Sequence, residues 1–312
     1  MSEVRRIMGK TAFIFPGQGA QVCGMGQDFY ENSETAKAVF DRATELLGFS
    51  VPELCFEKND RLDITEYTQA AMVTTSVAMM KVMEERGIHA DVAAGLSLGE
   101  YCALVAAGVM TADDAIRTVR ERGILMQEAV PAGVGGMSAV LGMTEDSVIE
   151  EACAKVTSGV VRPVNYNCPG QIVISGLKEA VETAAVKLKE AGARRVIPLN
   201  VSGPFHSYLL EEAGEKLGKF LENIPVSEPK IPYVANVTAA YVTKAEDVKP
   251  LLTRQVSSSV RWQQSVETML ADGVDRFIEI GPGKTLAGFI RKINREATVI
   301  NIEKFEDLEK LN

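Results

Sequence analysis

The sequence has 312 residues, of which 46% are hydrophobic and 24% are charged, and its formal net charge is −9. This length allows one large domain with an insertion, or two domains. The acidic balance argues against nucleic acid as a partner, because binding to phosphates needs a basic face.

Cysteine usage and the N-terminal segment bear on the location of the protein. The five cysteines form no C-x-x-C pair and no metal-type cluster, so we expect reduced thiols in the cytoplasm and neither disulfides nor a metal site. Arg5 and Arg6 are not followed by an apolar core, so no signal peptide is expected. The apolar stretch 68–83 is interrupted by polar residues and too short to span a bilayer, which indicates a buried helix and no membrane partner.

The chain opens with an apolar strand at 10–15 and a Gly-rich turn at 16–21. The G-x-G-x-x-G spacing of dinucleotide-binding turns fails because position 22 is Val22. The turn either brings a backbone N–H close to a ligand or is an ordinary tight turn. Helices are then expected at 29–47 and 68–87.

A short apolar strand at 91–95 and an Ala- and Leu-rich helix at 100–110 flank Gly95-Leu-Ser-Leu-Gly99. A G-x-S-x-G between a strand and a helix is typical of a nucleophile elbow, where a strained turn exposes the serine hydroxyl beside free N–H groups. The pattern predicts that Ser97 attacks an acyl carbon, with a plain tight turn as the alternative. A helix at 111–129 follows, with Thr111 as its N-cap.

The pattern changes after the Gly-rich segment 131–136. The next elements follow the β-α-β-β-α-β order of the ferredoxin-like motif. Their strands are expected at 137–141, 159–166, 171–175 and 194–200, and their helices at 144–157 and 177–191. The α/β alternation then returns, with helices at 206–223, 246–271 and 284–294 and strands at 231–237, 274–280 and 298–302.

We therefore predict an α/β fold with two parts. A large α/β-hydrolase-like domain with a mainly parallel sheet is formed by 1–130 and 203–312, and a ferredoxin-like subdomain is inserted at 131–202. Ligands are expected in the cleft between them. The Gly-Lys-Thr at 283–285 is not part of a P-loop, because isoleucine occupies position 278 where a glycine is required; we interpret it as a strand-to-helix turn.

The sequence contains two histidines, which makes the search for a general base short. His89 lies in a connector before a strand and is interpreted as a surface residue. His206 lies where the chain re-enters the large domain, at the cleft. If Ser97 is a nucleophile, His206 is the candidate to accept its proton; by itself it would more simply be structural.

Seven segments in this order resemble the malonyl-CoA:acyl carrier protein transacylases of type II fatty acid synthesis, over about residues 10–300. They are Phe15-Pro-Gly-Gln-Gly19, Gly95-Leu-Ser-Leu-Gly-Glu100, Arg122-Gly-Ile-Leu-Met-Gln127, Asn165-Tyr-Asn-Cys-Pro-Gly-Gln171, Gly203-Pro-Phe-His-Ser207, Gln255 and Glu279-Ile-Gly-Pro-Gly283. Each segment alone is a weak signal, whereas seven in register are specific.

The resemblance implies a catalytic set and a two-step reaction. Ser97 would attack malonyl-CoA with His206 as base, and the resulting O-malonyl serine would pass its acyl group to the phosphopantetheine thiol of holo acyl carrier protein. The main-chain carbonyl of Gln255 would orient the imidazole, which accounts for the lack of a triad acid. The backbone N–H groups of Gln18 and Leu98 would form the oxyanion hole. No cofactor is implied.

The resemblance also implies residues that select the substrate. Arg122, which its helical spacing alone would place at the surface, would pair with the free carboxylate of the malonyl group. Phe205 beside the base accompanies malonyl use in related acyltransferases, and Met126 and Asn167 match positions near the acyl site. Leu96 is a departure, because relatives often carry histidine there, and it makes the local pocket polarity uncertain.

Carrier docking needs a local basic patch, because the carrier and this chain are both acidic. Lys284, Arg291 and Lys292 share one C-terminal helix and are candidates for this patch, with a solvated helix face as the alternative. We expect a monomer that binds malonyl-CoA and holo acyl carrier protein.

Three other functions are alternatives. A trans-acting polyketide acyltransferase would use the same residues in another pathway. A serine hydrolase or thioesterase would release acyl groups to water. It differs from a transferase, whose site must exclude water until the second thiol arrives. A non-enzymatic scaffold would need neither Ser97 nor His206.

Overall fold

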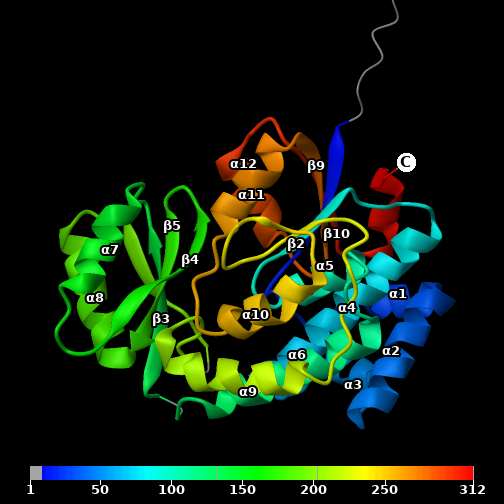
Figure 1. Ribbon diagram of the computed structural model, residues 1–312, viewed down its shortest axis with the longest axis horizontal. Helices are drawn as coiled ribbons and strands as arrows, with labels where there is room; N and C mark the ends of the chain where they lie inside the picture. Colours follow the sequence, from blue (N-terminus) through cyan, green and yellow to red (C-terminus); the bar gives the residue numbers. More distant parts are fainter. Residues whose placement is uncertain (1–8, 132, 202, 312) are drawn as a thin grey trace, which may run out of the picture.

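The computed structural model describes residues 9–131, 133–201 and 203–311, so Arg5 and Arg6 lie outside the described residues. Two sheets organise the chain (Figure 1). The larger has six strands in the order β10-β9-β1-β2-β7-β8, parallel except for the last pair. Its strands are β1 (Lys10–Phe15), β2 (Val92–Gly95), β7 (Tyr233–Val234), β8 (Tyr241–Val242), β9 (Val274–Ile280) and β10 (Thr298–Ile302).

The central strands of the large sheet are apolar and short, as buried parallel strands are. β1 and β2 pair in parallel with Phe15 opposite Gly95. Their carboxyl ends therefore lie side by side, and so do the Gly-rich turn after β1 and the elbow after β2. In open α/β sheets this edge is where ligands bind.

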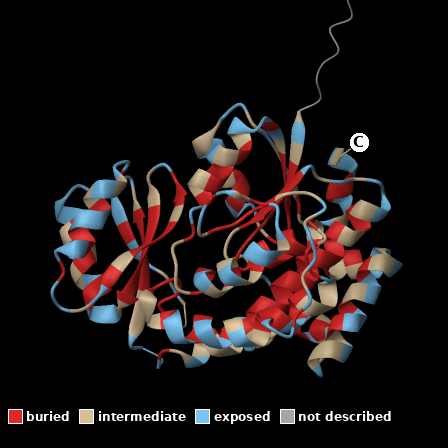
Figure 2. Ribbon diagram, in the orientation of Figure 1, coloured by how far each residue is buried: buried red, intermediate tan, exposed pale blue. Residues whose placement is uncertain are grey.

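Helices pack against the large sheet and bury its faces (Figure 2). They are α1 (Gln27–Asn32), α2 (Glu34–Leu47), α3 (Val51–Phe56), α4 (Thr65–Glu85), α5 (Gly99–Ala106), α6 (Ala112–Glu128), α9 (Glu211–Leu221), α10 (Ala245–Gln255), α11 (Trp262–Ala271) and α12 (Thr285–Ile293). The apolar stretch 68–83 lies inside α4, whose residues are mostly buried, so the prediction of a core helix is confirmed. No helix of the described residues is long and apolar enough to cross a membrane.

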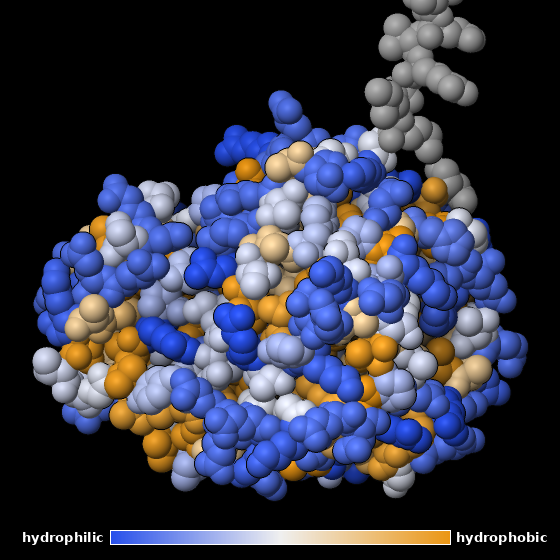
Figure 3. Space-filling model, in the orientation of Figure 1, coloured by the Kyte–Doolittle hydropathy of each residue, from blue (hydrophilic) through white to orange (hydrophobic). Residues whose placement is uncertain are grey.

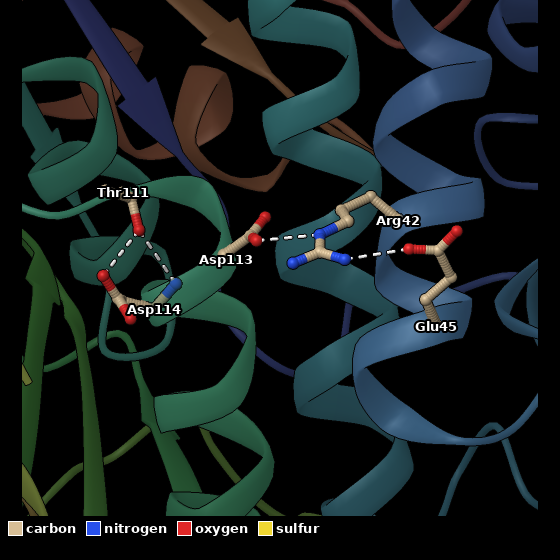
Figure 4. Close-up of polar contacts among 5 residues, drawn as sticks. All are labelled: Arg42, Glu45, Thr111, Asp113 and Asp114. Carbon is tan, nitrogen blue, oxygen red and sulfur yellow. Dashed lines mark hydrogen bonds and ion pairs between the residues drawn. The ribbon is translucent and has the colours of Figure 1, made fainter.

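Polar contacts at the surface connect α2 to the start of α6 (Figure 4). Arg42 donates from Nε to Asp113 at 2.8 Å and from Nη1 to Glu45 at 2.8 Å. Thr111 accepts from the backbone N–H of Asp114 at 3.1 Å, which confirms it as the N-cap of α6.

The smaller sheet has the order β4-β5-β3-β6 and is antiparallel throughout. Its strands are β3 (Gly135–Leu141), β4 (Val161–Cys168), β5 (Gln171–Leu177) and β6 (Arg195–Pro198), and its helices are α7 (Asp146–Ala154) and α8 (Lys178–Glu190). This is the predicted ferredoxin-like arrangement, with a hydrophobic core of its own. The domain boundaries near 131 and 202 stay a prediction, because residues 132 and 202 lie outside the described residues.

Three expected helices are wrong in extent. The helix expected at 29–47 is two helices, because the extended Ser33 ends α1 and its side chain caps α2. The helix expected at 206–223 begins only after a 3₁₀ turn (Tyr208–Leu210), which leaves His206 in a turn. Helix α3, strand β8 and a C-terminal 3₁₀ helix (Phe305–Leu311) were not predicted.

The third wrong helix, expected at 246–271, is interrupted because the segment 256–261 pairs with the small sheet. Val260 donates its N–H to the carbonyl of Val164 at 2.7 Å and accepts from the N–H of Tyr166 at 2.9 Å. Ser259 Oγ donates to the carbonyl of Pro163 at 3.0 Å. A tertiary contact therefore overrides a helical sequence, and it fixes β4 beside the C-terminal end of α10.

Candidate active site

The elbow between β2 and α5 holds Ser97 in a left-handed conformation, with φ of 52°. Such a backbone is strained for a residue with a side chain, and it needs close packing on both sides. A Cβ added to Gly95 would lie 2.0 Å from the backbone of Gly99, and one added to Gly99 would lie 2.1 Å from the carbonyl oxygen of Phe15. Both glycines of the G-x-S-x-G are thus required by close backbone contacts.

Asn236, which follows β7, fixes the elbow from the neighbouring strand. Its Oδ1 accepts from the Ser97 N–H at 2.6 Å, and its Nδ2 donates to the Gly95 carbonyl at 2.6 Å. Nothing in the surrounding sequence predicts this role, because it depends on β7 lying next to β2 in the sheet.

The structure brings Ser97 and His206 together although 109 positions separate them. Ser97 Oγ lies 2.7 Å from His206 Nε2, and His206 Nδ1 lies 2.9 Å from the main-chain oxygen of Gln255. A carbonyl can only accept, so Nδ1 carries the hydrogen and Nε2 is free to accept the serine proton. Burial, with the charge of Arg122 second, lowers the pKa of His206 to about 4, so the imidazole is neutral at pH 7.

Arg122 on α6 is fully buried and lies beside the nucleophile. Its Nη2 donates to Ser97 Oγ at 3.2 Å and to Gln255 Oε1 at 3.0 Å, and its Nη1 donates to Gln69 Oε1 at 2.8 Å. The surface position that helical spacing alone would give it is therefore excluded. A cation at this position can form an ion pair with an anionic group of an acyl chain attached to Ser97.

A buried carboxylate under the elbow escaped the sequence analysis. Glu100 Oε2 accepts from Gln255 Nε2 at 2.7 Å and from the N–H of Asn236 at 3.1 Å. Burial raises the pKa of Glu100 to about 7. The available signal was a single charged residue in the otherwise uncharged helix α5. Gln69, which accepts a hydrogen bond from Arg122, was also missed. Its only signal in the sequence is that it is a polar residue within a mostly apolar helix.

The proposed oxyanion-hole residues lie on adjacent turns. Gln18 lines the cavity beside Ser97, and Leu98 is buried at the N-cap of α5. In the part of the chain that the structure describes, the main-chain N–H of neither residue has a hydrogen-bond partner. The two turns touch, since a Cβ added to Gly17 would lie 2.7 Å from the Leu96 carbonyl oxygen.

A cavity of about 410 Å³ lies over the Ser97–His206 pair, with walls from both sheets. Met126, Asn167 and Phe205 line it, as do Arg122 and Gln18, whereas Gln255 lies behind it. Asn167 Oδ1 is buried without a partner among the described residues, so it is free to accept from a ligand. Leu96, the departure noted in the sequence, adds an apolar wall.

The predicted docking cations are exposed on or beside α12, whose first turn lines the same cavity. Lys284 precedes the helix, and Arg291 and Lys292 lie in its last turn. Lys292 Nζ donates to Gln171 Oε1, another cavity residue, at 3.4 Å. Hydrophilic side chains cover most of the face seen in Figure 3. His89 is exposed, as predicted. Across the described ranges, no group of three or more His, Cys, Asp or Glu residues could hold a metal ion.

A family model described as the acyl transferase domain matches residues 12–305. The chain belongs to this family. It is 46% identical over 305 residues to the malonyl CoA-acyl carrier protein transacylase of Bacillus subtilis, covering 97% of this chain and 96% of that protein. The α/β fold with two sheets and the acyltransferase class, both expected from the sequence, are thereby confirmed.

Solved structures of acyl transferases agree closely with this chain. An acyl carrier protein S-malonyltransferase from Vibrio cholerae has a TM-score of 0.94 at 43% identity, covering 97% of this chain and 100% of that one. A malonyl-transacylase in complex with its type II PKS acyl-carrier protein has a TM-score of 0.94 at 40% identity, covering 96% and 98%. The fold is therefore that of enzymes named for malonyl transfer.

Proposed function

We propose that this acyl transferase moves the malonyl group of malonyl-CoA to the phosphopantetheine thiol of holo acyl carrier protein and supplies fatty acid elongation. One observation carries the proposal: Ser97 Oγ lies 2.7 Å from a neutral imidazole and 3.2 Å from a buried guanidinium. The first contact suits nucleophilic attack, and the second suits an acyl group that ends in a carboxylate. The names of the relatives support the same reaction.

In the first half-reaction, Ser97 Oγ attacks the thioester carbonyl while its proton moves to Nε2 of His206. The carbonyl of Gln255 stabilises the imidazolium through Nδ1–H. The developing oxyanion would accept from the N–H groups of Gln18 and Leu98; losing one such donor typically costs about 3–4 kcal/mol. Collapse breaks the C–S bond, the leaving thiolate takes the proton from His206, and O-malonyl Ser97 remains.

The second half-reaction runs the same chemistry with the carrier's thiol. His206 accepts the thiol proton, the sulfur attacks the ester carbon, and Ser97 Oγ leaves with the proton that His206 returns. Arg122 holds the malonyl carboxylate through both steps. Met126 and Phe205 contribute apolar walls to the cavity, which disfavours water as the acceptor and so favours transfer over hydrolysis.

The carrier reaches the cavity over α12 in this proposal. Lys284, Arg291 and Lys292 are exposed there, and an acidic carrier complements them. A second candidate function, supply of a polyketide pathway, is favoured by one relative that is bound to a type II PKS acyl-carrier protein. We propose a monomer acting in the cytoplasm, without nucleic acid as a partner.

Intact-mass spectrometry tests the reaction. Mixing the protein with malonyl-CoA should add one malonyl group, and adding holo acyl carrier protein should move that group to the carrier. Ser97→Ala should remain unmodified in the same mixture. Loss of the adduct to water at the same rate without carrier would instead establish a hydrolase. Comparing fatty acid and polyketide carriers as acceptors separates the two pathways.

A further inference from the structure

Glu100 is a buried acid with no cation in contact. It lies in the first turn of α5, just after the elbow, and is 1% exposed. None of the ion pairs formed by the described residues includes it. It does not line the cavity over Ser97 and takes no part in the acyl transfer proposed above. Taking a carboxylate out of water without a counterion is costly, so Glu100 needs a compensating role.

One oxygen of this carboxylate accepts two hydrogen bonds from distant parts of the chain. Glu100 Oε2 accepts from Gln255 Nε2 at 2.7 Å and from the main-chain N–H of Asn236 at 3.1 Å. Gln255 is the last residue of α10, and Asn236 follows β7. Glu100 therefore connects the end of a helix and the end of a strand to the elbow.

The contact with Asn236 supports the nucleophile. The side chain of Asn236 accepts from the Ser97 N–H and donates to the Gly95 carbonyl, both at 2.6 Å. Ser97 has a φ of 52°, a strained backbone that persists only where its surroundings fix it. The hydrogen bond to Glu100 holds the main chain of Asn236, and this side chain extends from it to the elbow.

The contact with Gln255 supports the base. The main-chain oxygen of Gln255 accepts from His206 Nδ1 at 2.9 Å, and its Nε2 also donates to the carbonyl of Ser97 at 2.9 Å. His206 is strained in the same way as Ser97, with a φ of 60°. In a Ser-His-Asp triad an acid orients the imidazole directly, whereas here an acid holds the residue whose carbonyl orients it.

We propose that Glu100 is a positioning residue for the acyl transfer. By accepting both hydrogen bonds on one oxygen, it sets the distance between Ser97 Oγ and His206 Nε2, which is 2.7 Å. A displacement of either group by about 1 Å costs about 100-fold in rate, because attack and proton transfer need both groups aligned. Glu100 thus affects the rate of acylation and not the binding of the substrate. The inference rests on the proposed function, because it assumes that Ser97 is acylated.

Two substitutions separate the hydrogen bonds of Glu100 from its charge. Glu100→Gln has nearly the same shape and loses the charge, but its amide oxygen can take the place of Oε2 and accept both hydrogen bonds. Glu100→Asp keeps the charge but is one methylene shorter, which withdraws the carboxylate from donors that lie at 2.7 and 3.1 Å. The glutamine variant should therefore keep the activity that the aspartate variant loses.

The measured quantity is malonyl loading of Ser97 in a single turnover, followed by intact mass at several concentrations of malonyl-CoA. With Glu100→Asp the maximal rate constant should fall about 100-fold, while the half-saturating concentration stays within about threefold of the wild type. With Glu100→Gln both quantities should stay within about threefold. Labelling of Ser97 by phenylmethanesulfonyl fluoride, which has no carboxylate but needs the same serine and base, should slow by the same factors.

Three results would overturn the proposal. In the first, a folded aspartate variant loads malonyl at the wild-type rate. In the second, the glutamine variant loses as much activity as the aspartate variant, which would make the charge responsible. In the third, malonyl loading slows while sulfonylation does not, because Glu100 would then act on the substrate through Arg122.

Melting temperatures identify a variant that has not folded. Glu100→Met removes the acceptor at nearly the same length; it then replaces the aspartate variant and should show the same loss. If neither variant folds, the role of Glu100 is structural and the proposal is rejected. A wild type that is sulfonylated but takes no malonyl would reject the proposed function, and the sulfonylation rates of the variants would still decide the role of Glu100.

Discussion

The pKa of His206 sets the pH range over which its imidazole can accept the proton of Ser97 in the proposed mechanism. A base must be neutral to accept a proton, and burial followed by the charge of Arg122 lowers this pKa from 6.5 to about 4. A histidine with a lowered pKa stays neutral, and active, at pH values where an ordinary one is charged.

The first prediction concerns pH. The acidic limb of kcat/KM for malonyl loading should have an apparent pKa near 4, with little loss of activity between pH 7 and 5.5. A profile measured with buffers of constant ionic strength checks this, with circular dichroism at each pH to show that the protein is folded. A limb near 6.5 would show that the imidazole is solvated.

At the same scale, sequence reasoning found the residues proposed to contact the substrate and missed several that hold them in place. The elbow motif predicts the role of Ser97, whereas that of His206 follows only if Ser97 is a nucleophile, and that of Arg122 follows from the family resemblance. Glu100, Asn236 and Gln69 act only through contacts that the fold creates, over sequence separations of up to 155 positions. No local pattern encodes such contacts.

Among the elements, the strand–turn–helix of the elbow leaves no room for an added side chain at its glycines. Gly95→Ala should lower the free energy of unfolding by more than about 3 kcal/mol, because the new methyl group would lie 2.0 Å from the backbone of Gly99. Denaturant unfolding measures this. Gly288→Ala on α12 is the matched control: nothing lies within 4 Å of its added Cβ, so stability should stay equal or rise by up to about 1 kcal/mol. Equal effects at both positions would contradict the packing described for the elbow.

Arg162 on strand β4 contacts His206, the proposed base. Its Nη2 donates to the main-chain oxygen of His206 at 3.2 Å and also to that of Ser257. Arg162→Ala should lower kcat about 10-fold with KM for malonyl-CoA unchanged, because His206 loses a contact that holds its left-handed backbone, φ 60°. The acidic limb should also move to higher pH, since the charge of Arg162 lowers the pKa of His206.

Arg162→Lys is the control for this prediction, because it keeps the charge and one donor. It should leave the acidic limb in place and restore part of kcat. An Arg162→Ala enzyme with wild-type kcat and pH profile would show that β4 does not position the base.

The elements themselves were predictable where the periodicity was local. The α/β alternation and the ferredoxin-like insertion follow from it. The break in the helix expected at 246–271 was not predictable, because Val260 pairs with β4 through hydrogen bonds that form only in the folded chain. The break in that helix also ends α10 at Gln255, whose carbonyl faces the imidazole. The misjudged element is therefore one that positions the site.

At the scale of the whole molecule, the proposed function requires a net negative protein to receive an acidic carrier. Reversing the charge of Arg291 and Lys292 to glutamate should raise KM for the carrier at least about 10-fold and leave KM for malonyl-CoA unchanged. Steady-state kinetics with each substrate varied separately checks this. A double variant of Lys37→Glu and Lys189→Glu, both exposed and away from the cavity, carries the same charge change and should have little effect. Equal effects of the two double variants would reject α12 as the docking helix.

The two sheets together build a cavity lined by Ser97, His206 and Arg122, the proposed nucleophile, base and carboxylate-binding cation. The most direct test of this account is a competition for Ser97 between equimolar malonyl-CoA and acetyl-CoA, read by the mass of the peptide that contains Ser97. The wild type should carry malonyl almost exclusively, and Arg122→Ala should lose malonyl and carry a larger share of acetyl. An Arg122→Ala enzyme that keeps the malonyl preference of the wild type would contradict the account.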